Sequence, residues 1–150
     1  FTGFATIYQR FLDTGKPAYR ILFEQMARTD GAVLFHCSAG KDRTGVAAAL
    51  LLDLAGVGHD EIVADYARSE ALLAPLVEIW RAQAAERATA APEQPPVDPE
   101  RGKKLLASNA EDMEATLALI GERWGRARGY LEALGLSPAE IDAIRSRMVA

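Results

Sequence analysis

The sequence has few of the residues that form disulfides or bind metals. In 150 residues it contains one cysteine and two histidines. A single cysteine cannot form an internal disulfide, so the sequence does not require an oxidising compartment. No apolar run reaches the roughly 18 residues of a membrane-spanning helix, and no segment resembles a signal peptide. We therefore expect no stable membrane insertion, and a cytoplasmic and a secreted location both stay open.

An excess of positive charge is also lacking. The chain carries 17 Lys and Arg against 21 Asp and Glu, a net charge of −4 at pH 7. This balance argues against a general binder of nucleic acid or of anionic membranes. Any anionic ligand must therefore be held by positive potential that is local to its site. The apolar content of 49% and the length predict one globular domain over residues 1–150.

Predicted β-strands are scarce as well. Only the continuous apolar run Ala32–Phe35 is typical of a strand, one that is buried on both faces. Such a strand needs neighbours, because its backbone groups would otherwise stay unpaired. We expect the missing strands upstream of Phe1 in a longer protein, so that this chain is truncated at its N-terminus, or from a second chain. Helical spacing of apolar residues predicts helices over residues 4–12, 18–26, 44–54, 59–69, 75–91, 108–124, 129–135 and 138–148.

Two capping boxes predict where helices begin. Ser108 is followed three residues later by Glu111, and Ser137 is followed three residues later by Glu140. In such a box the serine side chain bonds forward to the backbone while the glutamate side chain bonds back. Pro138 stands at the first position of the last predicted helix, where its missing N–H has no cost.

The chemistry of the chain is concentrated in "HCSAGKDRTG", residues 36–45, between the predicted strand and a buried helix. A strand-to-helix turn points successive backbone N–H groups into one concavity at the positive end of the helix dipole, which suits phosphate. Gly40 lets the backbone turn tightly around the ligand. Arg43 can offer two parallel donors to two phosphate oxygens. Positive potential at the base of the turn would favour the thiolate of Cys37.

These elements predict a mechanism. The Cys37 thiolate attacks phosphorus, and the amides and Arg43 hold the equatorial oxygens as negative charge spreads over them. A cysteinyl-phosphate forms, and water then hydrolyses it. Thr44 can donate its hydroxyl to the sulfur and stabilise it as nucleophile and as leaving group. We expect no metal and no cofactor, because this mechanism requires neither.

The loop resembles the signature loop of the cysteine-dependent protein tyrosine phosphatase superfamily. Its Lys41 and Asp42 are similar to those of the bacterial tyrosine/serine phosphatases related to mycobacterial PtpB, whose loops are also similar to those of phosphoinositide phosphatases. The segment "DYARS", residues 65–69, and the C-terminal tail, residues 113–148, resemble the same group. The likeness extends from about Tyr8 onward.

The resemblance implies an α/β fold in which a central sheet is flanked by helices. This chain would hold the catalytic strand and mostly the C-terminal helices. It also implies hydrolysis of phosphate monoesters, with phosphotyrosine as first choice and phosphoserine, phosphothreonine (dual specificity) or a phosphoinositide as alternatives. The partner is then a phosphorylated protein or a phosphoinositide. By position and character, residues 72–106, which include a proline-rich stretch, resemble a lid over the active site.

The proton donor to the leaving group is the open assignment. Many tyrosine phosphatases use an upstream aspartate in a Trp-Pro-Asp motif, which this sequence lacks. The resemblance implies Asp42 as a candidate for this role, because the loop aspartate at this position in the resembling group is a candidate proton donor. The positive neighbours Lys41 and Arg43 would favour its ionised form, so a donor upstream of the chain stays an alternative.

The remaining loop side chains have predicted roles of their own. We expect Lys41 to face the mouth of the site and attract acidic groups of the substrate. We expect His36 to order the loop and Asp65 to brace it by accepting hydrogen bonds. The predicted catalytic residues are Cys37, Arg43, Asp42, Thr44 and His36, and the predicted substrate-binding residues are Ser38, Ala39, Gly40, Lys41, Asp42 and Arg43.

Two other classes of function stay open. A catalytically silent module could use the same loop to bind phosphorylated partners. A rhodanese-like sulfurtransferase also uses a loop cysteine, although its loop is usually shorter than the five residues that separate Cys37 from Arg43.

Overall fold

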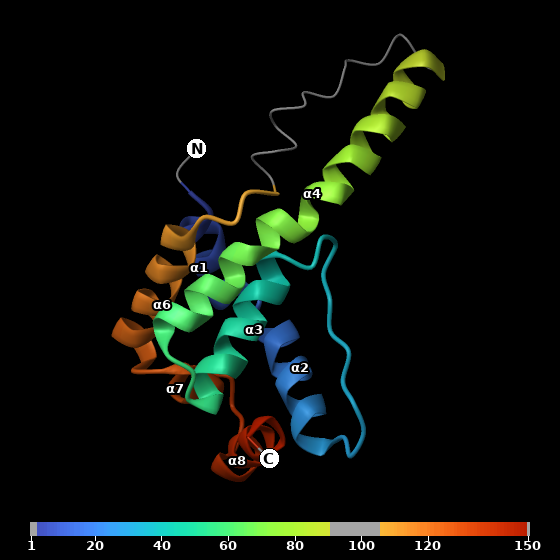
Figure 1. Cartoon of the computed structure of the whole chain (residues 1–150). Coiled ribbons are helices and arrows are strands. Elements are labelled where there is room, and N and C mark those ends of the chain that lie inside the picture. The colour runs from blue at the N-terminus through green and yellow to red at the C-terminus, as the bar shows by residue number, and fades with distance from the viewer. Residues whose placement is uncertain (1–2, 91–105, 150) are drawn as a thin grey trace.

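The described part of the molecule is helical. The computed structural model describes residues 3–90 and 106–149, and no strand occurs among them. Figure 1 shows the helices gathered into one body from which the far half of α4 projects. The helices are α1 (Phe4–Thr14), α2 (Lys16–Arg28), α3 (Asp42–Ala55), α4 (His59–Ala90), α6 (Ala110–Trp124), α7 (Ala127–Ala133) and α8 (Pro138–Met148).

Helix α3 is the centre of the core. Its residues are apolar nearly all round, which is the pattern of a helix buried on every side, and it packs against α1, α4, α7 and α8. Leu50 and Val46 are fully buried. The helix ends at Gly56, whose φ of 95° lies in the left-handed region that glycine adopts without strain. The predicted buried helix is confirmed, and it holds the loop that precedes it on a rigid support.

Helix α4 differs from the expectation. The sequence predicts two helices that meet near Pro75, whereas one helix runs from His59 to Ala90 with Pro75 inside it. Its first half packs on α3 and α6, and its far half projects beyond the other helices (Figure 1). Leu72, just before the middle of the helix, and Ile79 and Trp80 on the far half are exposed. No helix of the described residues combines the length and the apolar character that crossing a membrane requires.

One of the two predicted capping boxes is present. At α8 the Ser137 hydroxyl accepts a hydrogen bond from the Glu140 amide at 3.3 Å, and the Glu140 carboxylate accepts one from the Ser137 amide at 3.0 Å. At α6 the prediction is wrong, because Asn109 precedes the first helical residue and has no side-chain cap. The Ser108 amide donates instead to Glu70 Oε2 on α4 at 3.2 Å.

The predicted strand is extended but unpaired. Residues 32–37 make no sheet ladder with another described segment, and they run beside α2 to the start of α3 (Figure 1). Leu34 is 90% exposed, while Val33 and Phe35 are half-buried. The turn before them is held by Arg147 of α8, which donates to the carbonyls of Thr29 and Gly31. The helical part of the predicted α/β fold is confirmed, whereas the central sheet is not seen in the described residues.

Candidate active site

The cysteine loop lies directly before α3. Residues 38–41 form bends, and helical geometry begins at Asp42. Gly40 has a φ of 73°, so the turn uses the left-handed region that L side chains rarely adopt. The amides of Gly40 and Lys41 in the loop and of Thr44 in the first turn of α3 are directed at the sulfur of Cys37.

Cys37 is the one free thiol of the chain and is half-buried. Burial raises the pKa of the Cys37 thiol, but hydrogen bonds to the sulfur from the Thr44 hydroxyl and from the amides of Thr44, Gly40 and Lys41 outweigh it. The resulting pKa is about 7, below the usual value of a cysteine. The lowered pKa favours the thiolate near neutral pH, and the thiolate is the nucleophilic form.

The loop amides are not bonded to oxygens of the described residues outside α3. No amide of residues 38–44 donates to a backbone carbonyl outside α3, or to a side-chain oxygen, within the described residues. Arg43 is exposed, and its guanidinium makes no hydrogen bond or ion pair with another described residue. Its carbonyl accepts a hydrogen bond from the Tyr19 hydroxyl of α2 at 3.3 Å. The amides of Gly40, Lys41 and Thr44 are directed at the sulfur, whereas the Arg43 guanidinium has no hydrogen-bond or ion-pair partner among the described residues.

Thr44 lies where the mechanism needs a hydroxyl. Its hydroxyl oxygen is buried and has no nitrogen or oxygen partner among the described residues, and the hydroxyl helps to lower the pKa of the Cys37 thiol. Beside the loop, a small pocket opens between α3 and α4. It is lined by Gly40, Thr44, Gly45, Asp65, Tyr66 and Ser69, among others.

The expectation for Lys41 is wrong. Its side chain is fully buried and does not face a ligand mouth. The ammonium donates to the Ala107 carbonyl at 2.7 Å, lies 3.0 Å from Asp42 Oδ1 and sits 3.7 Å above the centre of the Phe4 ring. The segment before α6 and the start of α1 supply this enclosure, which the loop sequence alone does not reveal. Lys41 contributes its backbone amide to the sulfur, and its side chain ties the loop to the body.

The Asp42 carboxylate is bound through one of its two oxygens. Its Oδ1 accepts a hydrogen bond from the Tyr8 hydroxyl of α1 at 2.6 Å, in addition to the contact with Lys41. Tyr8 in turn contacts the hydroxyl of Tyr66 on α4. Sequence reasoning missed both tyrosines, because their helical spacing is that of ordinary core residues. Their hydroxyls were the only signal, since a buried tyrosine hydroxyl usually finds a partner.

The sequence predicts that Asp65 and His36 support the loop through hydrogen bonds. Asp65 is exposed and makes no hydrogen bond with a described residue, so the predicted brace is absent. His36 is exposed, and its Nδ1 lies 2.9 Å from the Cys37 carbonyl, a contact within the loop itself. Over residues 3–90 and 106–149, no three His, Cys, Asp or Glu side chains come close enough to hold a metal ion.

Comparison with known proteins agrees with this geometry. The sequence pattern of the tyrosine phosphatase family matches residues 1–150. The chain is 40% identical over 147 residues to a tyrosine-protein phosphatase of Nostoc commune, which covers 94% of this chain and 47% of that protein. It is 38% identical over 120 residues to the triple specificity protein phosphatase PtpB of Mycobacterium tuberculosis, which covers 75% of this chain and 42% of that protein.

The chain thus spans less than half the length of the relatives it matches. The family resemblance that the loop predicted is confirmed over the whole chain. The loop around Cys37 and the match over residues 1–150 lead to the same conclusion: this chain belongs to the tyrosine phosphatase family.

Proposed function

We propose that the protein hydrolyses phosphate monoesters through a cysteinyl-phosphate on Cys37. The observation that carries this proposal is the sulfur itself. It accepts hydrogen bonds from Thr44, Gly40 and Lys41, which lower the pKa of its thiol to about 7 although burial raises it. A buried structural cysteine has no need of such donors. Membership in the tyrosine phosphatase family supports the same reaction.

The reaction proceeds in two steps. The Cys37 thiolate attacks phosphorus, the phosphorus–sulfur bond forms, and the ester oxygen leaves with its electron pair and takes up a proton. Free loop amides and Arg43 stabilise the three equatorial oxygens in the transition state. Water then attacks the cysteinyl-phosphate and releases inorganic phosphate, and the sulfur leaves as a thiolate. Thr44 stabilises the sulfur in both steps, because a hydroxyl donor favours the thiolate.

Asp42 is the proposed proton donor to the leaving oxygen. It stands next to Arg43 at the start of α3, and its carboxylate is partly exposed on the loop side of the molecule. A donor supplied from outside the described residues is the alternative. Assays of an Asp42 variant with different leaving groups distinguish these two candidate donors. A proton donor matters most for an ester whose leaving oxygen is strongly basic, so loss of the true donor should slow such an ester most.

The proposed substrates are phosphorylated proteins, phosphotyrosine first. The name of the relative from Mycobacterium tuberculosis includes triple specificity, which supports more than one class of phosphorylated substrate for this chain. Phosphoserine, phosphothreonine and phosphoinositides are the further candidates. Lys41 does not contribute to this choice through its side chain, because that side chain is buried.

Two structural proposals accompany the function. The extended segment 32–37 is completed into a sheet by strands from another segment or another chain, which its unpaired backbone and the 90% exposure of Leu34 support. The far half of α4 belongs to a lid over the site, which the exposed Leu72, Ile79 and Trp80 support. Residues 91–105 of the predicted lid lie outside the described residues.

A substrate panel tests the function. Wild type, Cys37→Ser and Asp42→Asn would be assayed as intact proteins with p-nitrophenyl phosphate, phenyl phosphate, phosphopeptides and a soluble phosphoinositide. We expect Cys37→Ser to be inactive on all of them. Asp42→Asn should lose about 10²–10⁴-fold on phenyl phosphate and much less on p-nitrophenyl phosphate. Tight phosphopeptide binding without turnover by the wild type would instead favour a silent binding module, and thiosulfate turnover would favour a sulfurtransferase.

A further inference from the structure

The tyrosine hydroxyls beneath the loop form a chain that ends on Asp42. Tyr8 is fully buried and Tyr66 is 4% exposed, yet neither hydroxyl pairs with a backbone carbonyl. Their ring planes stand at 85° with centroids 6.0 Å apart, an edge-to-face contact that brings the two hydroxyls together. Three separate elements, α1, α3 and α4, meet at this point.

The direction of the chain follows from the number of protons. A tyrosine hydroxyl has one proton to donate, and Tyr8 donates it to Asp42 Oδ1 at 2.6 Å. In the contact between the two tyrosines Tyr8 must therefore accept, and Tyr66 must donate. Burial raises the pKa of Tyr8, and its bond to Asp42 adds to the rise. Burial also raises the pKa of Tyr66, to about 12. Both phenols hence keep their protons at any working pH.

The surroundings contain few other charges. Lys41 Nζ lies 3.0 Å from the same Oδ1 of Asp42. Asp112 of α6 and Glu70 of α4 are the remaining charged groups near Tyr66 and Ser108, and Glu70 is committed to the Ser108 amide. Ser108 lies beside Tyr66 with a buried hydroxyl that has no regular partner. Of these groups only Lys41 contacts Oδ1, and none of them donates to Oδ2.

The two carboxyl oxygens of Asp42 are therefore not equivalent. Oδ1 receives both Tyr8 and Lys41, whereas no described residue donates to Oδ2. Protonation of a carboxyl oxygen that already accepts two hydrogen bonds is unfavourable, because the new proton would be repelled by the two donor hydrogens. Rotation of the carboxyl would break both contacts. The acid form thus carries its proton on Oδ2.

We propose that Tyr8, backed by Tyr66, is a positioning residue that fixes the Asp42 carboxyl by Oδ1 and leaves Oδ2 as the oxygen that delivers the proton to the leaving group. The inference rests on the proposed function, in which Asp42 is the proton donor. Neither tyrosine touches the substrate. Their effect reaches the reaction only through Asp42, which makes it separable from a general effect on folding.

The test compares two esters in the intact protein. Tyr8→Phe and Tyr66→Phe keep the rings and remove one hydroxyl each. We expect Tyr8→Phe to lower kcat/KM for phenyl phosphate about tenfold. For p-nitrophenyl phosphate, whose leaving group needs no proton, kcat/KM should fall less than about twofold. Tyr66→Phe should show the same pattern more weakly. The inhibition constant of inorganic phosphate should not change, because the loop amides and Arg43 stay in place.

Two controls separate positioning from stability. Tyr130→Phe removes a hydroxyl that is equally buried but donates to the Leu12 carbonyl, away from the loop, and it should leave the ratio between the two esters unchanged. In an Asp42→Asn background, Tyr8→Phe should have no further effect on this ratio, since the two residues act as one unit.

Several results would overturn the positioning role of Tyr8. Equal losses on both esters, or the same pattern in Tyr130→Phe, would show a structural role and overturn it. A full additional loss in the Asp42→Asn background would also overturn it. If the wild type hydrolyses neither ester, the proposed function fails and this inference with it, whereas activity of the wild type with an unaltered ester ratio in Tyr8→Phe defeats the inference alone.

Discussion

At the scale of single residues, Cys37 and Thr44 decide whether the loop is reactive. The Thr44 hydroxyl is the first of the groups that lower the pKa of the thiol to about 7 against the effect of burial. The sequence predicts this role of Thr44 from its place directly after Arg43 at the end of the loop, but it does not reveal whether another group already binds the hydroxyl. The structure shows that no described nitrogen or oxygen does.

We therefore predict the pH dependence of alkylation at Cys37. A group with a lowered pKa is ionised at lower pH, so the rate of reaction with iodoacetamide should rise with a midpoint near pH 7. Thr44→Val should move the midpoint upward, because the hydroxyl donor to the thiolate is lost. As the chain has one cysteine, the total thiol loss measures this site alone.

Thr116→Val is the matched control. Thr116 is a buried threonine whose hydroxyl donates to the Asp112 carbonyl, far along the chain from the loop. It should leave the midpoint unchanged. A wild-type midpoint near that of a free cysteine, about 8.5, would refute an activated thiol.

At the scale of elements, α3 is fixed to α7 by one buried carboxylate. Asp53 accepts hydrogen bonds from the Ala127 amide at 2.7 Å and from Arg126 at 2.6 and 3.0 Å. His59 Nε2 lies 3.4 Å from the same carboxylate. The bond to Ala127 satisfies an amide in the first turn of α7 that would otherwise be buried without a partner. This contact holds the C-terminal end of the helix whose N-terminal end carries the loop.

Asp53→Asn should lower the free energy of unfolding by about 2 kcal/mol at pH 7. Burial raises the pKa of Asp53, but Ala127, Arg126 and His59 hold it below the usual range in the folded protein. The ionised carboxylate therefore contributes stability above the unfolded pKa, and this contribution is lost as the pH falls through the folded pKa. The difference between variant and wild type should shrink below about pH 4.

Urea unfolding at several pH values measures this effect. Asp142→Asn is the control, because Asp142 is an exposed partner of Arg128, and an exposed pair contributes about 0–1 kcal/mol. A cost for Asp53→Asn that stays constant down to pH 3 would contradict the assigned role of its charge.

The sequence predicts the helices and the reactive loop better than the contacts between helices. Helices were predictable where the apolar periodicity is strong, as in α1 and α2. The apolar run predicted α3, and the capping box at Ser137 predicted the start of α8. The reactive loop was predictable because its residue types and spacing are specific. The burial of Lys41 was not, because its acceptor Ala107 lies 66 residues away in the chain. The contact of Tyr8 with Asp42 spans 34 residues and that with Tyr66 spans 58. Contacts at such separations depend on how the helices pack.

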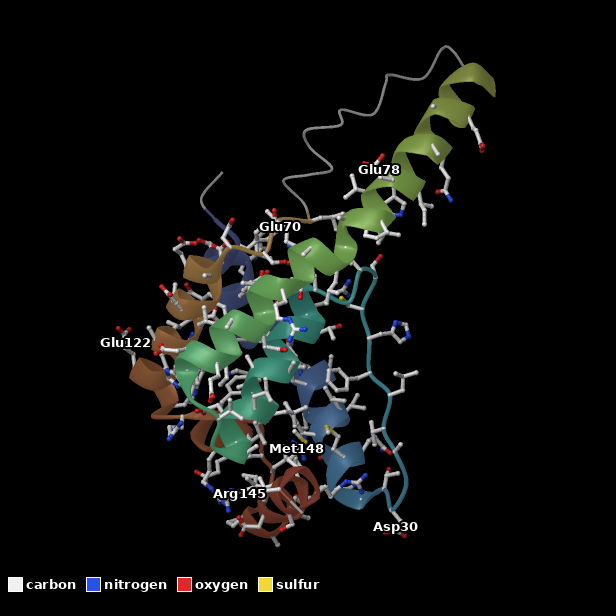
Figure 2. All side chains as sticks on the ribbon, viewed as in Figure 1. Asp30, Glu70, Glu78, Glu122, Arg145 and Met148 are labelled. Atoms are coloured by element: carbon white, nitrogen blue, oxygen red, sulfur yellow. The ribbon has the colours of Figure 1, made fainter. Side chains whose placement is uncertain are left out.

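At the scale of the whole molecule, the body supports the loop from one side. Figure 2 shows Glu70 on α4 near the segment that leads to α6, and Asp30, Arg145 and Met148 at the opposite end of the body. The extended residues 32–37 lie on the outside, between α2 and solvent (Figure 1). The contacts of Lys41 with Ala107 and of Asp42 with Tyr8 hold the loop at the start of α3, whereas the extended segment before it joins no sheet ladder within the described residues.

Hydrogen exchange of the chain 1–150 tests this description. We expect the amides of residues 33–36 to exchange rapidly, because no described carbonyl accepts them. The amides in the middle of α3 should be among the slowest, since that helix is buried on all sides. Equal protection of both segments would show a paired strand in this chain and contradict the description.

The covalent intermediate tests the central claim most directly. The intact protein would be mixed with p-nitrophenyl phosphate, quenched with acid within milliseconds and digested, and the peptide that contains Cys37 would be examined by mass spectrometry. The account predicts one phosphoryl group on Cys37 that forms with a burst of p-nitrophenol, decays with turnover and is absent in Cys37→Ser. Turnover without any phosphoryl group on that peptide, or turnover retained in Cys37→Ser, would contradict it.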